Sequence, residues 1–154
     1  MLNADYIIGL VDGEGSFSVR IPNNKRRAKV ELTFSLKLRH QDKEILSELQ
    51  KFFGYGNIYI QRDKRKNHSL CYRFEVHNKK EIIERVIPFF KENPPKIQSR
   101  KRDFELFKEI VNLSQSASID LKKINFLKEQ MHWGLAVYGK SVRTVGNQVT
   151  LIVS

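Results

Sequence analysis

Asp12 and Glu14 stand two residues apart in an alternation of acid and glycine, with Gly13 and Gly15, directly after the apolar segment Tyr6–Val11. A carboxylate at the buried end of an apolar helix costs several kcal/mol unless a cation or another partner compensates it. Asp-Gly dipeptides also form turns, so the same residues could end a helix and begin a strand. The pair therefore indicates either a site that binds a cation or an ordinary helix end.

Gly9, three residues before the acids, is a second unusual choice in this segment. Glycine in the middle of a helix is about 1 kcal/mol less favourable than alanine. The residue is explained if another backbone must approach closely there. We therefore expect a close helix contact at this position.

A period-two alternation of apolar and polar residues predicts two β-hairpins after the acids. The first spans residues 16–38 around a loop at Pro22–Arg27, and the second pairs 57–61 with 70–77 across a basic tip. A helix follows each hairpin. The helix signals are Asp42 as an N-cap, Gly54 as a stop, Asn78 as the next cap, Pro88 as a kink or end, and periodic segments near 101–113 and 118–132.

This order of elements predicts an α+β protein. Four antiparallel strands with one apolar face need helices on that face only, which gives a two-layer αββαββα domain. We expect the domain to span residues 1–133. Residues 134–154 would extend it, either as short strands or as an irregular tail.

Positive charge is concentrated in three short segments. The chain has 28 Lys and Arg against 17 Asp and Glu, a formal net charge of +11. The segments 20–29, 62–66 and 96–102 hold thirteen of the bases and one acid, so the surplus is wholly local. One basic run is usually a solvated loop, but three that carry the whole excess favour a surface for a polyanion.

Composition also excludes several classes of protein. The single Cys71 excludes a disulfide framework and a cysteine zinc site, and the four His residues lack metal-ligand spacing. No apolar run approaches the roughly 20 residues of a membrane helix, and the N-terminus does not resemble a signal peptide. We expect a soluble protein of a reducing intracellular compartment (cytoplasm, nucleoid or organelle matrix), with no membrane partner.

The face of the sheet that the helices leave open is polar, and basic tips extend both hairpins. A two-stranded ribbon fits the major groove of B-DNA, where donors and acceptors identify each base pair. An ordinary solvent-facing sheet would be polar too, but the basic tips favour a reading surface. The candidate DNA-contacting residues are Ser18, Arg20, Asn24, Arg26, Arg27, Lys29, Glu31, Thr33, Ser35, Lys37, Tyr59, Gln61, Arg73 and Glu75.

The stretch IIGLVDGEGSF, residues 7–17, resembles the signature of the LAGLIDADG homing endonucleases. The order of elements over about residues 5–113 resembles the αββαββα core of that family, and FGYGNI at 53–58 resembles its passage from helix to strand. Ile8 departs from the family, which usually has a small residue before the motif glycine.

The resemblance implies a site around the end of the motif helix. In the family this helix packs two units together, which here assigns the interface to Ile7, Ile8, Gly9, Val11 and Asp12. The last acid and a carbonyl bind a divalent cation, which implies Glu14 and Gly13 as ligands of Mg²⁺, or of Mn²⁺ or Ca²⁺ in its place; Asp12 would support them. The remaining implied catalytic residues are Lys101, with Arg100 or Lys96 as alternatives, and one polar residue among Arg39, His40 and Gln41.

The resemblance also implies an activity. A single motif implies a homodimer that cleaves a long, near-palindromic site in double-stranded DNA. The alternative on the same scaffold is a non-cleaving RNA-binding maturase or DNA-binding regulator, although such a protein has no need of an acid at Glu14. An unrelated RNA-binding module would usually expose several stacking aromatics, and the open face offers only Tyr59.

Overall fold

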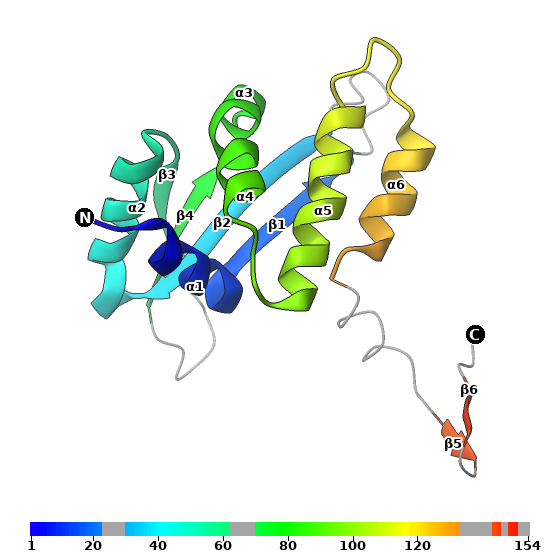
Figure 1. The fold of residues 1–154 in the computed structure, drawn as a ribbon, viewed down its shortest axis with the longest axis horizontal. Coiled ribbons are helices and arrows are strands. Elements are labelled where there is room, and N and C mark those ends of the chain that lie inside the picture. The colour runs from blue at the N-terminus through cyan, green and yellow to red at the C-terminus, as the bar shows by residue number, and fades with distance from the viewer. Residues whose placement is uncertain (23–29, 62–69, 133–142, 146–147, 151–154) are drawn as a thin grey trace.

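Figure 1 shows a computed structural model in which helices cover one face of a four-stranded sheet. The structure describes residues 1–22, 30–61 and 70–132, together with the backbone of 143–145 and 148–150. Within these ranges the two-layer α+β architecture predicted from the sequence is confirmed.

The sheet consists of the two predicted hairpins. β1 (Gly15–Arg20) pairs with β2 (Glu31–Arg39), and β3 (Asn57–Gln61) pairs with β4 (Cys71–Val76). The order is β1-β2-β4-β3, so β2 and β4 lie side by side in the centre. All neighbouring pairs are antiparallel.

The helices are short and join the strands in the predicted order. A 3₁₀ turn, η1 (His40–Asp42), leads into α2, and a π-helical turn, η2 (Ile82–Val86), joins α3 to α4. The α-helices are α1 (Ala4–Glu14), α2 (Lys43–Phe53), α3 (Lys79–Glu81), α4 (Ile87–Glu92), α5 (Gln98–Leu113) and α6 (Leu121–Gln130).

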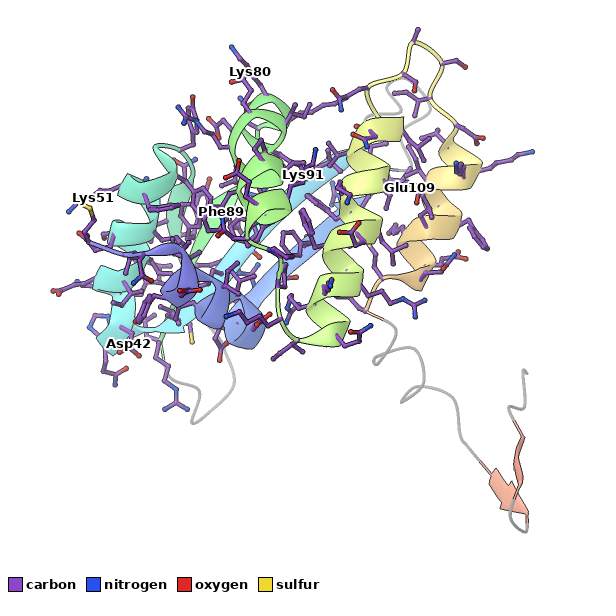
Figure 2. The ribbon with its side chains drawn as sticks, in the orientation of Figure 1. Asp42, Lys51, Lys80, Phe89, Lys91 and Glu109 are labelled. Carbon is purple, nitrogen blue, oxygen red and sulfur yellow. The ribbon has the colours of Figure 1, made fainter. Side chains whose placement is uncertain are left out.

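Phenylalanine rings form the centre of the core between the sheet and the helices. The ring of Phe17 in β1 lies 5.3 Å from that of Phe34 in β2 and meets Phe90 of α4 edge-on at 5.2 Å. These three rings are fully buried, and burying such a side chain stabilises the fold by about 1.5–3 kcal/mol. Figure 2 shows Phe89 between α4 and α2, where its ring lies 5.3 Å from that of Phe53.

Two predicted helix signals act differently in the structure. Asp42 precedes α2, but its side chain makes no capping hydrogen bond. The 3₁₀ turn gives Asp42 a near-helical backbone instead of the extended conformation of an N-cap. Of the two alternatives for Pro88, a kink or an end, the structure contradicts the end, because α4 continues past Pro88 to Glu92 after the wide turn η2. A wider turn relieves the clash between the proline ring and the carbonyl four residues earlier.

The segment after α6 contains short strands, one of the two alternatives left open by the sequence. β5 (Arg143–Val145) and β6 (Gln148–Thr150) form a separate antiparallel pair. Among the described helices, none is long and apolar enough to cross a membrane.

Candidate functional site

The two acids lie within the last turn of α1, which continues three residues beyond the predicted end at Val11. The Gly15 N–H donates to the Val11 carbonyl and closes this turn. A Cβ at Gly15 would lie 2.7 Å from both the Val11 carbonyl oxygen and its Cγ1 atom. Only glycine therefore lets the chain pass from α1 directly into β1, and this passage fixes the position of Glu14.

Glu14 is the exposed last residue of α1. None of the residues that the structure describes forms a hydrogen bond or an ion pair with its carboxylate. The last turn of α1 contains no basic residue, and the negative end of the helix dipole points there. Carboxylate and carbonyl oxygens are the ligands that Mg²⁺ takes, so Glu14 and the carbonyl of Gly13 fit a hard divalent cation.

One chain supplies only part of such a site. Within residues 1–22, 30–61 and 70–132, no three His, Cys, Asp or Glu side chains gather as a metal cluster. A cation at Glu14 would therefore take further ligands from water, from an oxygen-rich substrate or from a second protein unit.

Asp12 has a different role from Glu14, because its carboxylate is bound within the chain. It accepts hydrogen bonds from the backbone N–H groups of Lys96, at 3.1 and 3.2 Å, and of Ile97, at 3.3 Å. Ile97 is the residue before α5 and has no capping side chain of its own. Asp12 therefore ties the end of α1 to the start of α5.

The residues exposed on α1 differ from those predicted to form an interface. Ile7 and Val11 are fully buried and Ile8 is 3% exposed, so these three belong to the core of the chain. Their expected role in an interface is wrong, because these side chains are buried within the core of the single chain. Gly9 and Gly13, one helical turn apart, are exposed instead, and a Cβ added at either would meet nothing within 4 Å.

Lys101, the favoured basic candidate, lies beside the first half of α1. It lines a hollow together with Asp5, Ile8 and the loop that precedes α5. Lys96 is also here, with its Nζ 3.8 Å from the Asp5 carboxylate. Asp5 and Glu14 are about 13 Å apart along the helix axis at 1.5 Å per residue, so the structure does not bring Lys101 to Glu14.

Arg100 is bound within the fold. Its side chain is 21% exposed, and its guanidinium lies 3.9 Å from the buried Asp103 carboxylate. Asp103 also accepts a hydrogen bond from the His132 backbone N–H at 2.9 Å and lies 3.0 Å from the ring Nδ1. Arg100 thus helps to join α5 to the end of α6, which leaves Lys101 as the better candidate for a phosphate contact.

This connection perturbs two titratable groups. Burial by itself would raise the pKa of Asp103, but the hydrogen bonds from His132 bring this pKa below its ordinary value. The bond to Asp103 raises the pKa of His132 in spite of its burial.

Gln41 lies at the same end of the sheet as Glu14. Gly15 at the start of β1 opposes Leu36, so β2 runs past β1 before it enters η1, where Gln41 is exposed. The structure thus brings Gln41 and Glu14 to the same end of the sheet, although they belong to different elements.

The predicted outward residues do share the open face of the sheet. Ser35 lies there between neighbouring strands but is only 9% exposed, which leaves it no surface for a base contact. Asn24, Arg26, Arg27 and Lys29 fall outside the described residues. The other predicted residues lie opposite residues of a neighbouring strand in the sheet. The pairs are Ser18 with Thr33, Arg20 with Glu31, Lys37 with Arg73, Tyr59 with Arg73, and Gln61 with Cys71.

His77 also forms hydrogen bonds on this face, although it is not among the residues predicted from the sequence to contact DNA. Its ring lies 3.1 Å from the Thr33 hydroxyl and 2.7 Å from the Glu75 carboxylate. The signal for His77 was present, since it continues the alternation of Arg73 and Glu75 by one step beyond the end of β4.

Comparisons with known proteins agree with this geometry. A family model described as LAGLIDADG endonuclease matches residues 7–111. The probable intron-encoded DNA endonuclease 1 of Mycosarcoma maydis is 33% identical over 105 residues, 68% of this chain and 35% of that protein. The probable intron-encoded endonuclease 2 of Neurospora crassa is 32% identical over 143 residues, 88% of this chain and 30% of that protein. The chain thus spans about a third of these relatives.

Solved structures show the same fold. The homing endonuclease I-TnaI has a TM-score of 0.71 and 28% identity, over 85% of this chain and 88% of its own. I-LtrWI, a LAGLIDADG homing endonuclease bound to target DNA, has a TM-score of 0.73 and 28% identity over 85% of this chain, but only 44% of its own. One structure thus matches this chain nearly end to end, and the other contains about twice its length.

Proposed function

The chain belongs to the LAGLIDADG endonuclease family, and on this premise we propose that it is a sequence-specific endonuclease that cleaves double-stranded DNA as a homodimer. The observation that carries the proposal is the state of Glu14, an exposed carboxylate without a bonding partner among the described residues, at the negative end of α1. The names of the curated relatives, both of them endonucleases, support the same activity.

Cleavage of a phosphodiester develops negative charge on the phosphorus oxygens and on the leaving oxygen. We propose that Glu14 and the Gly13 carbonyl hold a Mg²⁺ ion, which when bound supplies a Lewis acid and lowers the pKa of a bound water. Glu14 gives the site its negative charge. Asp12 keeps the end of α1 in place through Lys96 and Ile97, so that the Glu14 carboxylate stays at the edge of the sheet.

The dimer is supported by the glycines of α1. Gly9 and Gly13 expose backbone without a side chain, which allows the same helix of a second copy to approach closely. The crossing would place two Glu14 carboxylates near one axis, one for each DNA strand. The length of I-LtrWI, of which this chain matches 44%, agrees with a need for two such units.

The DNA surface is the open face of the sheet, with Gln41 as the proposed contact near the scissile phosphates and Lys101 as a proposed contact to a phosphate further from Glu14. Arg20, Lys37 and Arg73 project from this face and supply donors for bases or phosphates. Two copies would present this surface twice, which fits a long, near-palindromic site.

Incubation with a library of long duplexes, with and without Mg²⁺, tests the proposal. The expected result is cut ends at a single family of sites, formed only with the metal. Selective binding of duplexes without cut ends would instead favour a DNA-binding regulator. Selective binding of structured RNA would favour a maturase.

A further inference from the structure

Five side chains on the open face form one continuous hydrogen-bonded row across three strands. Arg73 donates to Gln61 Oε1 at 2.9 Å and to Glu75 Oε1 at 3.1 Å. The second oxygen of Glu75 lies 2.7 Å from His77 Nε2, and His77 Nδ1 lies 3.1 Å from the Thr33 hydroxyl. We call Gln61, Arg73, Glu75, His77 and Thr33 the polar row.

Glu75 is the centre of the polar row and the least exposed of its titratable members. Its side chain is 15% exposed, against 37% for Arg73 and 50% for His77. Each carboxylate oxygen of Glu75 already has a partner. It is therefore poorly placed to accept a hydrogen bond from a base, which revises its predicted role as a direct DNA contact.

The chemistry of each group determines the direction of every bond in the polar row. A carboxylate only accepts, so His77 Nε2 must carry a proton towards Glu75. In the neutral ring Nδ1 is then an acceptor, and the Thr33 hydroxyl donates to it. A guanidinium only donates, so the Gln61 atom that faces Arg73 is the amide oxygen.

These bond directions determine which donor and acceptor groups of the polar row remain available to bases. Gln61 turns its oxygen towards Arg73, and its NH₂ group has no partner among the described residues, which suits an acceptor such as guanine O6 or thymine O4. Thr33 uses its proton on His77 and keeps its lone pairs, which suit a donor such as the N4 amino group of cytosine. Without Glu75, His77 could change tautomer and Gln61 could rotate.

We propose that Glu75 is a positioning residue that sets the hydrogen-bond polarity of the polar row, so that the base pairs facing Thr33, Arg73 and Gln61 are recognised as one unit. The inference rests on the proposed binding of double-stranded DNA. It adds that base preferences at these positions are coupled through a residue that touches no base.

The test is selection from a library of randomised duplexes in EDTA, which prevents cutting, with the parent protein and Glu75→Gln. The variant keeps the size of Glu75 but cannot accept from both neighbours. Preferences at two or more positions of each half-site should relax together, by about tenfold each. Glu31→Gln is the matched control, because it removes the same charge from the same face, and among the described residues Glu31 bonds to Arg20 alone. It should affect at most one position.

A second variant and a spectrum keep the test independent of the stability of Glu75→Gln. Thr33→Val in the parent protein should also alter the preference at the position that Gln61 reads, although β4 separates β2 from β3. The ¹⁵N spectrum of the His77 ring should show a proton on Nε2 in the parent and a tautomer mixture in Glu75→Gln.

Three outcomes would overturn the inference. Unchanged preferences in both variants would mean that the polar row does not couple its members. A change at one position only would make Glu75 itself a base reader. Absence of any sequence preference in the parent protein would overturn the proposed function as well as the inference. The first two outcomes would overturn the inference alone.

Discussion

The Asp12 carboxylate accepts a hydrogen bond from the backbone N–H of Ile97, which lies 85 positions later in the chain and just before α5. Lys96 and Ile97 precede the first turn of α5, so Asp12 holds the backbone that leads into this helix and not the N–H groups of its first turn. The bond joins the helix that carries Glu14 to the helix that begins beside the basic segment. Asp12 therefore holds the end of the helix that carries Glu14 without being a metal ligand.

Replacement of Asp12 by alanine should lower both stability and cleavage. An intramolecular hydrogen bond contributes about 0.5–1.5 kcal/mol to stability, and the released N–H groups of Lys96 and Ile97 should exchange faster with solvent. Cleavage should fall because the start of α5 is no longer held against α1. Thermal unfolding, amide hydrogen exchange and cleavage rates, measured on one preparation, check the prediction.

Asp120→Ala is the matched control for this variant. Asp120 caps α6 by accepting from the Lys123 N–H at 3.0 Å, on a helix that does not carry a candidate site residue. It should cost similar stability and leave cleavage unchanged. If the two variants reduced cleavage equally, the effect of Asp12 would be one of stability alone.

Gly9→Leu should weaken association while leaving the single chain stable. A Cβ at Gly9 meets nothing within 4 Å, and leucine favours a helix over glycine by close to 1 kcal/mol. The protomer should therefore be no less stable, whereas the close helix crossing should be blocked. Sedimentation at several protein concentrations, with and without duplex DNA, measures the loss.

Ser47→Leu places the same side chain on the exposed face of α2, and it should leave association unchanged. A parent protein that sediments as a monomer both free and on DNA would contradict the proposed homodimer.

The pair of Asp103 and His132 should make stability depend on pH in both directions. Asp103 has a lowered pKa, so its contribution is present above its unfolded value of 3.8 and is lost as the pH falls through the lower folded value. His132 has a raised pKa, so its contribution is present below 6.5 and is lost as the pH rises through the higher folded value. The thermal midpoint should exceed that of His132→Gln most in weakly acidic solution. A constant difference from pH 3 to 9 would contradict the ion pair.

The sequence predicts the strands and their faces well, because a period of two specifies which side chains face the core. The alternation of apolar and polar residues places Phe17 and Phe34 on the inward face, and their rings stack there. The motif helix is harder to assign. Ile7 and Val11 look equally suited to a core and to an interface, since both environments are apolar, and only their packing against the sheet decides between them.

Contacts distant in sequence account for the remaining differences. Nothing in the spacing of Asp12 and Ile97 indicates that they meet, because their contact depends on how α5 packs beside α1. The bonds of His77 likewise require the register of β2 against β4, which brings Thr33 within reach. Pattern therefore assigns residues to faces, and tertiary packing determines which of them become partners.

Glu14→Gln should abolish cleavage while preserving the fold and DNA binding. The amide keeps the size of the side chain but removes the charge that would hold Mg²⁺ at the scissile phosphate. Cleavage should fall by several orders of magnitude, since metal activation and charge stabilisation supply much of the reduction in the barrier. Binding should persist or become tighter, because one carboxylate fewer repels the phosphates. Stability should not fall, because no described residue bonds to this side chain.

Asp12→Asn is the comparison that separates a metal ligand from a structural acid. It should reduce cleavage less than Glu14→Gln but reduce stability more, because Asp12 holds Lys96 and Ile97 whereas Glu14 is free of such bonds among the described residues. Thermal midpoint, DNA affinity and cleavage rate should be measured on the same samples. A folded, DNA-binding Glu14→Gln protein that cuts at the parent rate would remove Glu14 from the active site and favour a binding function without cleavage.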